Sequence, residues 1–207
     1  DHPDWTLRGI LKTGSFWSMA FCFTAISTIF IGIQQNLAPL AQDNGISAMA
    51  VSTAVAAMAT LMIGAKLVYG YLADRINIRH LYLTTSAALA TALVILSLAE
   101  ISYSLLLVVA CLVGVAAGSS MPLSASIIRR AFGPKSFGRA KGLMYTVVSF
   151  SAIGPWIAGL IYDATGGYDI AWLALGLVLV PAIFASSGLS GKAPARNQTK
   201  PSELTSG

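Results

Sequence analysis

Long apolar runs separated by short polar breaks dominate the sequence. A helix that crosses a lipid bilayer needs about 20 predominantly apolar residues. Alternating segments of about ten residues, which would indicate a membrane β-barrel, do not occur. The pattern therefore predicts an all-α integral membrane protein with six transmembrane helices, at Phe16–Ala38, Ala48–Ala73, Leu81–Ala99, Tyr103–Ile128, Ala140–Tyr162 and Ile170–Leu189.

The polar segments at the two ends suggest a three-part organisation. Residues 1–14 form a lead-in in which Trp5, Leu7 and Leu11 alternate with charges, which predicts an amphipathic helix lying on the cytoplasmic membrane surface. Residues 15–189 form the helical bundle, and residues 190–207, rich in Ser, Lys, Pro and Thr, predict a disordered cytoplasmic tail. Because the chain begins with Asp1 rather than Met, we expect it to be a piece of a longer protein.

The composition supports a protein whose solvent is lipid. Hydrophobic residues make up 56% of the chain and charged residues 10%, whereas soluble domains carry about 25% charged residues. The net charge of +5 would also fit a nucleic-acid-binding protein, so the placement of the basic residues decides between the two.

All basic residues except Lys66 fall on one side of the predicted membrane. The opposite side carries carboxylates and neither Lys nor Arg. The positive-inside rule makes the basic side cytoplasmic, which predicts a multi-pass protein of the cell membrane (inner or plasma membrane) with both termini in the cytoplasm and no nucleic-acid partner. The basic residues of that side are Arg8, Lys12, Arg75, Arg79, Arg129, Arg130, Lys135, Arg139, Lys141, Lys192, Arg196 and Lys200, and the opposite carboxylates are Asp43, Glu100, Asp163 and Asp169.

Residues typical of catalysis or metal binding form no recognisable set. Cys22 and Cys111 lie inside apolar runs, where cysteine behaves as a small hydrophobic residue. His2 and His80 are far apart, and there is no Ser-His-Asp set or phosphate-binding loop. We therefore expect no enzyme activity, no metal and no cofactor.

Small residues mark the fourth and fifth spans. Gly114-x-x-x-Gly118 lies in the fourth, and Gly154-Pro155 lies in the fifth. Glycines four residues apart allow helix backbones to pack closely, whereas Gly and Pro can also kink a helix that lines a cavity. The sequence leaves both interpretations open.

Lys66 is the one charged residue well inside a predicted span. It precedes Asp74 by a helical rise of about 12 Å, which places it between the bilayer surface and the midplane. Its stem could extend to the headgroups and bind nothing, or it could face a hydrated cavity and hold an anion, the default interpretation of an intramembrane charge. Tyr69 and Gly70, three and four residues further on, would share its helix face.

The stretch "GYLADRINIR" resembles the loop motif G-x-x-x-D-R-x-G-R-R that follows the second helix of each half in the major facilitator superfamily. Gly70, Asp74, Arg75 and Arg79 match, whereas Asn77 stands in place of the usual Gly. The resemblance implies that the chain is the C-terminal six-helix half of a twelve-helix transporter, with an absent N-terminal six-helix half as partner. It also implies a gating role for these four residues, in which the loop docks against a neighbouring helix end and releases it.

A finer resemblance is to monocarboxylate transporters and oxalate–formate antiporters. Members of this branch carry a cation, usually Arg, four residues before the Gly of the loop motif, where this chain has Lys66. A second cation that antiporters carry after a Tyr-Thr pair is absent here, since Val147-Val148 follows Tyr145-Thr146, and this favours a singly charged anion. The candidate substrate contacts are Lys66, Tyr69, Tyr145, Ser149 and Gln34.

Some of these contacts have structural alternatives. The Ser149 hydroxyl could bond back to its own helix, and Gln34 could cap the helix end before Pro39.

The leading hypothesis is secondary active transport of a small organic anion by alternating access. The resemblance implies that this anion is a monocarboxylate and that it moves in symport with protons. One alternative is an exporter of drug-like or neutral compounds, in which Lys66 only reaches to the headgroups. Another is a membrane scaffold or sensor that does not transport.

Overall fold

The structure, a computed structural model, describes residues 4–188, and these contain no β-strand. This agrees with the all-α prediction, while the predicted tail lies outside the described residues. The elements in chain order are α1 (Leu7–Leu11), α2 (Gly14–Asp43), α3 (Ala48–Ala73), α4 (Ile78–Leu98), α5 (Tyr103–Val148), the 3₁₀ helix η1 (Ser149–Ala152), α6 (Ile153–Thr165), α7 (Asp169–Ala185) and the 3₁₀ helix η2 (Ser186–Gly188).

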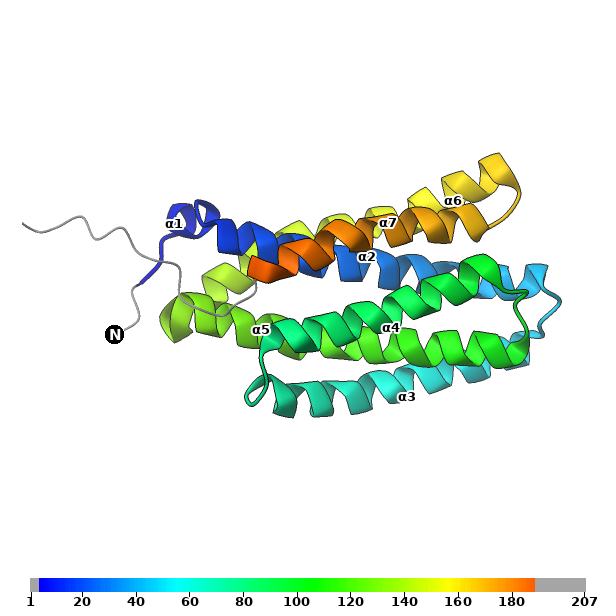
Figure 1. The fold of residues 1–207 in the computed structure, drawn as a ribbon, viewed down its shortest axis with the longest axis horizontal. Coiled ribbons are helices and arrows are strands. Elements are labelled where there is room, and N and C mark those ends of the chain that lie inside the picture. Colours follow the sequence, from blue (N-terminus) through cyan, green and yellow to red (C-terminus); the bar gives the residue numbers. More distant parts are fainter. Residues whose placement is uncertain (1–3, 189–207) are drawn as a thin grey trace, which may run out of the picture.

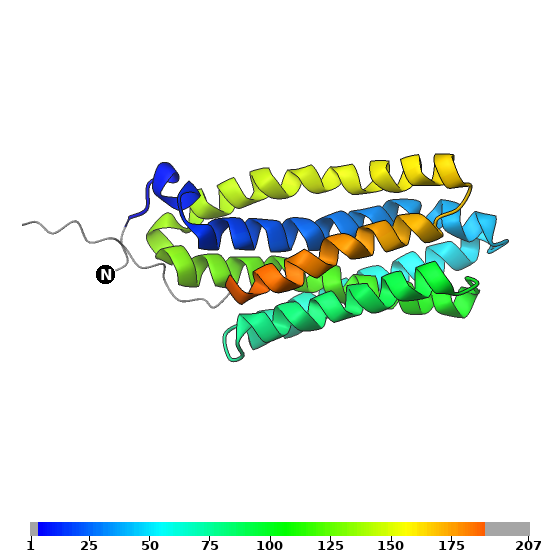
Figure 2. The same cartoon turned by 45° about the horizontal axis from the view of Figure 1, so that its top comes forward.

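Within residues 4–188, four helical stretches are long and apolar enough to cross a membrane, namely α2, α3, α4 and the stretch Tyr103–Thr165 that joins α5, η1 and α6. Helix α7 is a shorter apolar helix of 17 residues. The long elements run side by side along the axis of the molecule (Figures 1 and 2). The several long apolar helices that the sequence predicts are therefore present.

The chain reverses direction inside α5 at Gly133. Its backbone angles, φ 75° and ψ 170°, are not helical, and positive φ is accessible mainly to glycine. The next residue, Pro134, has no N–H to donate to a helix that would continue across the break. A first arm (residues 103–132) and a second arm (residues 134–148) thus run in opposite directions (Figure 2).

The break between the fourth and fifth predicted spans is shorter than expected. The polar segment 129–139 is helical on both sides of Gly133. Its Arg, Lys and Ala residues are compatible with a helix, so polarity ends the apolar run there without ending the helix.

Charges separate toward the two ends of the molecule. Helix α1, the α3–α4 connection and the α5 reversal lie at one end, and the α2–α3, α4–α5 and α6–α7 connections lie at the other (Figure 1). The first end, here called the basic end, carries every described Lys and Arg except Lys66: Arg8, Lys12, Arg75, Arg79, Arg129, Arg130, Lys135, Arg139 and Lys141. The second, the acidic end, carries Asp43, Glu100, Asp163 and Asp169.

Glycines allow α3 and α5 to pack backbone against backbone. A β-carbon built on Gly114 would collide with the Met58 carbonyl oxygen, and one on Gly118 would collide with that of Met62. Gly154 meets the carbonyl oxygen of Thr28 in α2 in the same way. Close packing is therefore the structural role of the Gly114-x-x-x-Gly118 pair.

The lead-in is clamped onto the reversal of α5. The Asp4 carboxylate lies 2.8 Å from the Arg139 guanidinium, and the Trp5 backbone N–H donates to Ser136 Oγ at 2.7 Å. The Trp5 ring packs edge-on against Phe132 with centroids 5.7 Å apart. These contacts, called here the lead-in clamp, tie the start of the described chain to both sides of Gly133.

Candidate functional site

Lys66 lines a hollow of about 270 Å³ between α2, α3 and both arms of α5. The side chain is exposed, and within the described part of the chain it carries the only charge among the lining residues. This cavity, called here the Lys66 hollow, is bounded by Phe23, Ile26, Ser27, Phe30, Ile31, Met62, Lys66, Ala117, Ser120, Met121, Ser124, Met144, Tyr145, Val148 and Ser151.

The Lys66 ammonium has no protein counter-ion here. Among residues 4–188, no carboxylate oxygen lies within 4.0 Å of it. A cation at this depth of a membrane helix costs about 3 kcal/mol on insertion scales, so its presence in a hollow with hydroxyl-bearing walls favours a functional role. The hollow can thus offer one positive charge and hydrogen-bonding groups to an anion whose remaining surface is apolar.

Tyr145 is the second predicted site residue in this hollow. It comes from the second arm of α5, on the opposite side of the Gly133 reversal from Ser120 and Ser124 of the first arm. Its side chain is 40% exposed. The reversal of α5 therefore lets one helix pair supply two walls of the same cavity.

The other predicted contacts lie elsewhere. The Tyr69 hydroxyl is 3.0 Å from Thr84 Oγ1 of α4, so its ring points away from the Lys66 hollow. Ser149 donates to the Tyr145 carbonyl oxygen at 2.8 Å and lines a different hollow, of about 460 Å³, which Tyr145 also lines. Gln34 is exposed and is not among the residues that line either cavity.

Near Gln34, the side-chain amide that makes hydrogen bonds is that of Asn36. Asn36 Nδ2 donates to the Gly32 carbonyl oxygen at 2.9 Å, and its Oδ1 accepts from the Tyr168 hydroxyl at 3.2 Å. Burial raises the pKa of Tyr168, and the neighbouring Tyr162 and Asp43 raise it further, so the hydroxyl keeps its proton and remains a donor. This contact joins α2 to the α6–α7 connection and is structural.

Several lining residues were not predicted from the sequence as site residues. Ser27, Phe30 and Ile31 of α2, and Ser124 of α5, face Lys66 across the hollow. Phe30 and Ile31 follow Ser27 by three and four residues, which indicates one face of α2, but a span that is apolar all round does not reveal which face borders a cavity.

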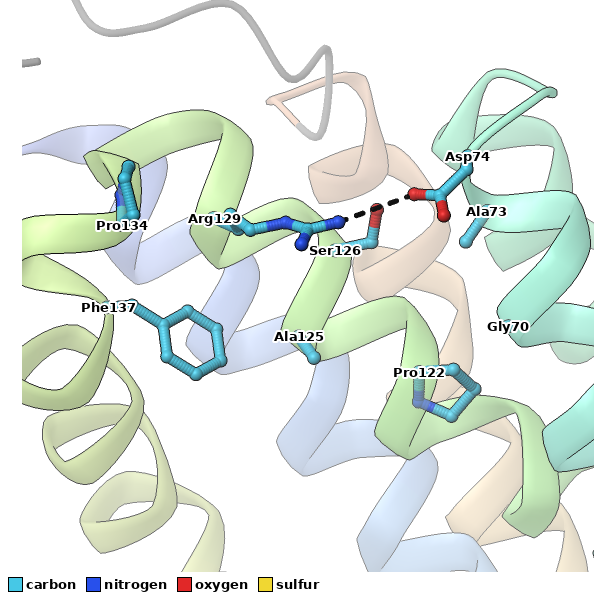
Figure 3. A pocket seen from close by; sticks show the side chains of 9 residues that line it. All are labelled: Gly70, Ala73, Asp74, Pro122, Ala125, Ser126, Arg129, Pro134 and Phe137. Carbon is cyan, nitrogen blue, oxygen red and sulfur yellow. Dashed lines mark ion pairs between the residues drawn. The ribbon is translucent and has the colours of Figure 1, made fainter. Parts of the chain in front are cut away.

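Two of the loop-motif residues, Gly70 and Asp74, line a second cavity of about 450 Å³ at the basic end (Figure 3). It is called here the gate hollow, and its lining residues are Gly70, Ala73, Asp74, Pro122, Ala125, Ser126, Arg129, Pro134 and Phe137. Asp74 lies 3.6 Å from Arg129 of α5 across its rim, and Arg130 donates to the Ala73 carbonyl oxygen. The end of α3 is thus docked on α5.

Arg75 and Arg79 make different contacts from Asp74. The Arg75 guanidinium, just beyond the end of α3, lies 4.2 Å from the centroid of the Tyr71 ring in the last turn of that helix. The Arg79 backbone N–H donates to Asn77 Oδ1 at 3.0 Å, which makes Asn77 the N-cap of α4. Asn77, which stands in place of the motif's Gly, therefore caps the start of the next helix.

Comparisons with known proteins point to one family. The sequence profile of the Major Facilitator Superfamily matches residues 15–205. The chain is 27% identical over 194 residues to "Monocarboxylate transporter 11" of Homo sapiens, covering 87% of this chain and 41% of the relative. It is 28% identical over 207 residues to the Mus musculus protein of the same name, covering 93% and 46%. The chain spans less than half the length of these curated relatives.

Proposed function

This chain belongs to the major facilitator superfamily, and from that premise we propose that it is one half of a secondary active transporter for a small organic anion. The substrate class we propose is a monocarboxylate, moved by alternating access in which one half rocks against the other. The family and the relatives point to transport across a membrane rather than to catalysis.

The observation that carries the proposal is the Lys66 ammonium in its hollow without a carboxylate partner. A carboxylate would neutralise this charge, and the apolar walls would accommodate a short carbon chain. Lys offers a point charge rather than the bidentate fork of Arg, which suits a single carboxylate. The name of the two relatives, "Monocarboxylate transporter 11", agrees with this class.

The architecture proposed for this half has six membrane passes. These are α2, α3, α4, the first arm of α5, the second arm continued through η1 and α6, and α7. At about 1.5 Å per residue, the 17 residues of α7 measure about 26 Å, close to the hydrocarbon thickness of about 30 Å. We assign the chain to the C-terminal half and expect an N-terminal six-helix half as its partner.

The proposed orientation places the basic end in the cytoplasm, following the positive-inside rule. In this orientation Asp74 and Arg129 lie at the cytoplasmic side, where their contact would break and re-form as the transporter opens inward. Gly70, Arg75 and Arg79 complete this gating loop. Proton coupling is proposed from the family; within the described helices no Asp or Glu borders the Lys66 hollow, so the proton site would belong to the partner half.

The direct test replaces Lys66 in the complete transporter, purified and reconstituted into vesicles. Lys66→Ala is expected to reduce uptake of labelled lactate by roughly tenfold or more, the effect of losing about 1.4 kcal/mol of binding, while insertion stays normal. Lys12→Ala, which removes an exposed lysine of the basic end, is the matched control and should leave uptake unchanged. Normal uptake by the Lys66→Ala protein would refute the anion site.

Competition then separates the alternatives. Inhibition of uptake by pyruvate or formate supports a monocarboxylate carrier. Transport of drug-like compounds that is insensitive to these anions would instead identify an exporter, and binding without accumulation would identify a sensor or scaffold.

A further inference from the structure

A ladder of three side chains follows one face of the second arm of α5. Phe137, Lys141 and Tyr145 are spaced by four residues, which brings them to the same helix face. The Lys141 ammonium lies 5.4 Å from the centroid of the Phe137 ring and 5.7 Å from that of the Tyr145 ring. The cation is therefore held between two aromatic rings, one turn to either side.

The two rings of the ladder belong to the two cavities described above. Phe137 lines the gate hollow, where Figure 3 shows its ring on the same cavity as Arg129 and Asp74. Tyr145 lines the Lys66 hollow. Lys141 lies between the two ring residues, about 6 Å along the helix from each, and is not itself among the lining residues of either cavity.

The Lys141 charge is available to a ligand. No carboxylate oxygen of residues 4–188 lies within 4.0 Å of it, in contrast to Arg139, which pairs with Asp4. Contact with an aromatic face stabilises a cation only weakly at an accessible site. The rings thus fix the position of the ammonium without neutralising it, and the side chain is only half-buried.

We propose that Lys141 forms an approach subsite that receives the substrate's carboxylate at the basic end and passes it to Lys66. This inference rests on the proposed function and adds a second cation to it. Two cations at successive depths divide the transfer of an anion into an apolar hollow into two shorter steps. A potential that attracts the anion at the mouth of the cavity also raises its local concentration and its rate of binding.

The subsite makes a prediction specific to one side of the membrane. In the complete transporter, Lys141→Met keeps an unbranched side chain between the rings and removes the charge. The lactate concentration that gives half-maximal initial rate is expected to rise about fivefold, the scale of one partly exposed charge interaction, when lactate is supplied from the basic-end side. Supplied from the opposite side, it should be unchanged, because lactate then reaches Lys66 without passing Lys141.

Two further variants separate charge from packing. Lys141→Arg keeps the positive charge and should restore the wild-type value to within about twofold. Lys135→Gln removes an exposed lysine six positions away at the same end and should have no effect. Raising the salt concentration should weaken the basic-side affinity of the wild-type protein and of the Lys135→Gln protein more than that of the Lys141→Met protein.

The outcomes distinguish this inference from the proposed function. If Lys66→Ala abolishes lactate uptake but Lys141→Met changes neither side, or changes both sides equally, the approach subsite is wrong and the anion site stands. If Lys66→Ala leaves lactate uptake intact, the proposed function itself fails. Failure of Lys141→Arg to recover the basic-side affinity would also overturn the subsite, because it would assign the effect to shape rather than charge.

Discussion

Asp74, at the end of α3, lies 3.6 Å from Arg129 in the first arm of α5, and the two side chains are 64% and 62% exposed. An ion pair this exposed contributes only about 0–1 kcal/mol to stability. It therefore suits the proposed gating role, because little free energy is needed to open the contact.

We expect Asp74→Asn to slow transport several-fold while leaving the protein folded. Since the pair contributes so little free energy, the melting temperature should shift by no more than about 4 °C. Initial uptake rates and thermal melts of the purified transporter measure the two effects.

Lys135→Gln is the control and should leave the rate unchanged, because Lys135 is exposed, lies outside the gating loop and makes no ion pair with the described residues. Exchanging the charges, with Asp74→Arg and Arg129→Asp together, should recover part of the rate. A charge-exchanged protein as slow as either single variant would contradict a role for the contact itself.

Gly118→Val is expected to prevent α3 and α5 from packing. The new β-carbon would meet the Met62 carbonyl oxygen and lie 2.8 Å from the Ala65 β-carbon, and forced overpacking costs about 1–3 kcal/mol or more. The amount of monodisperse protein after detergent extraction measures the loss.

Gly159→Ala is its matched control, because nothing lies within 4 Å of a β-carbon built there in α6. This variant should be at least as stable as the wild type, since Ala favours a helix interior by about 0.5–1 kcal/mol. Equal loss in both variants would show that helix composition, not close packing, governs stability.

Gly133→Ala should destabilise the reversal of α5. A residue with a β-carbon is strained at φ 75° and ψ 170°, at a cost of about 1–3 kcal/mol. The melting temperature is expected to fall by several degrees, whereas Gly138→Ala, in helical backbone with open space around it, should not lower it. A wild-type melting temperature for Gly133→Ala would mean that the turn tolerates another conformation.

The apolar pattern predicted helix positions well and helix ends less well. The predicted range Ala48–Ala73 is the observed extent of α3. Helix α2 instead continues past the predicted end at Ala38, through Pro39 to Asp43. Hydropathy indicates where a helix would leave the hydrocarbon. The helix itself ends where the pattern of backbone hydrogen bonds stops, which can be several residues further on.

The candidate site, too, could be predicted from the sequence only in part. The depth of Lys66 follows from counting residues to Asp74, and the hollow around it agrees with the cavity interpretation. The direction of Tyr69 could not be predicted, because three residues amount to about 300° of helix rotation and Thr84 of α4 offers a hydrogen-bond partner on that side. The contribution of Tyr145 depends on the α5 reversal, a tertiary feature that periodicity does not encode.

The lead-in clamp couples the start of the described chain mechanically to the helical bundle. Asp4 and Trp5 grip residues 132–139 on both sides of Gly133, and the second arm carries Tyr145 into the Lys66 hollow two to three turns further on. A displacement of the lead-in would therefore move the Gly133 reversal first and the second arm of α5 after it. The lead-in and the wall of this cavity are thereby linked through a single short segment of chain.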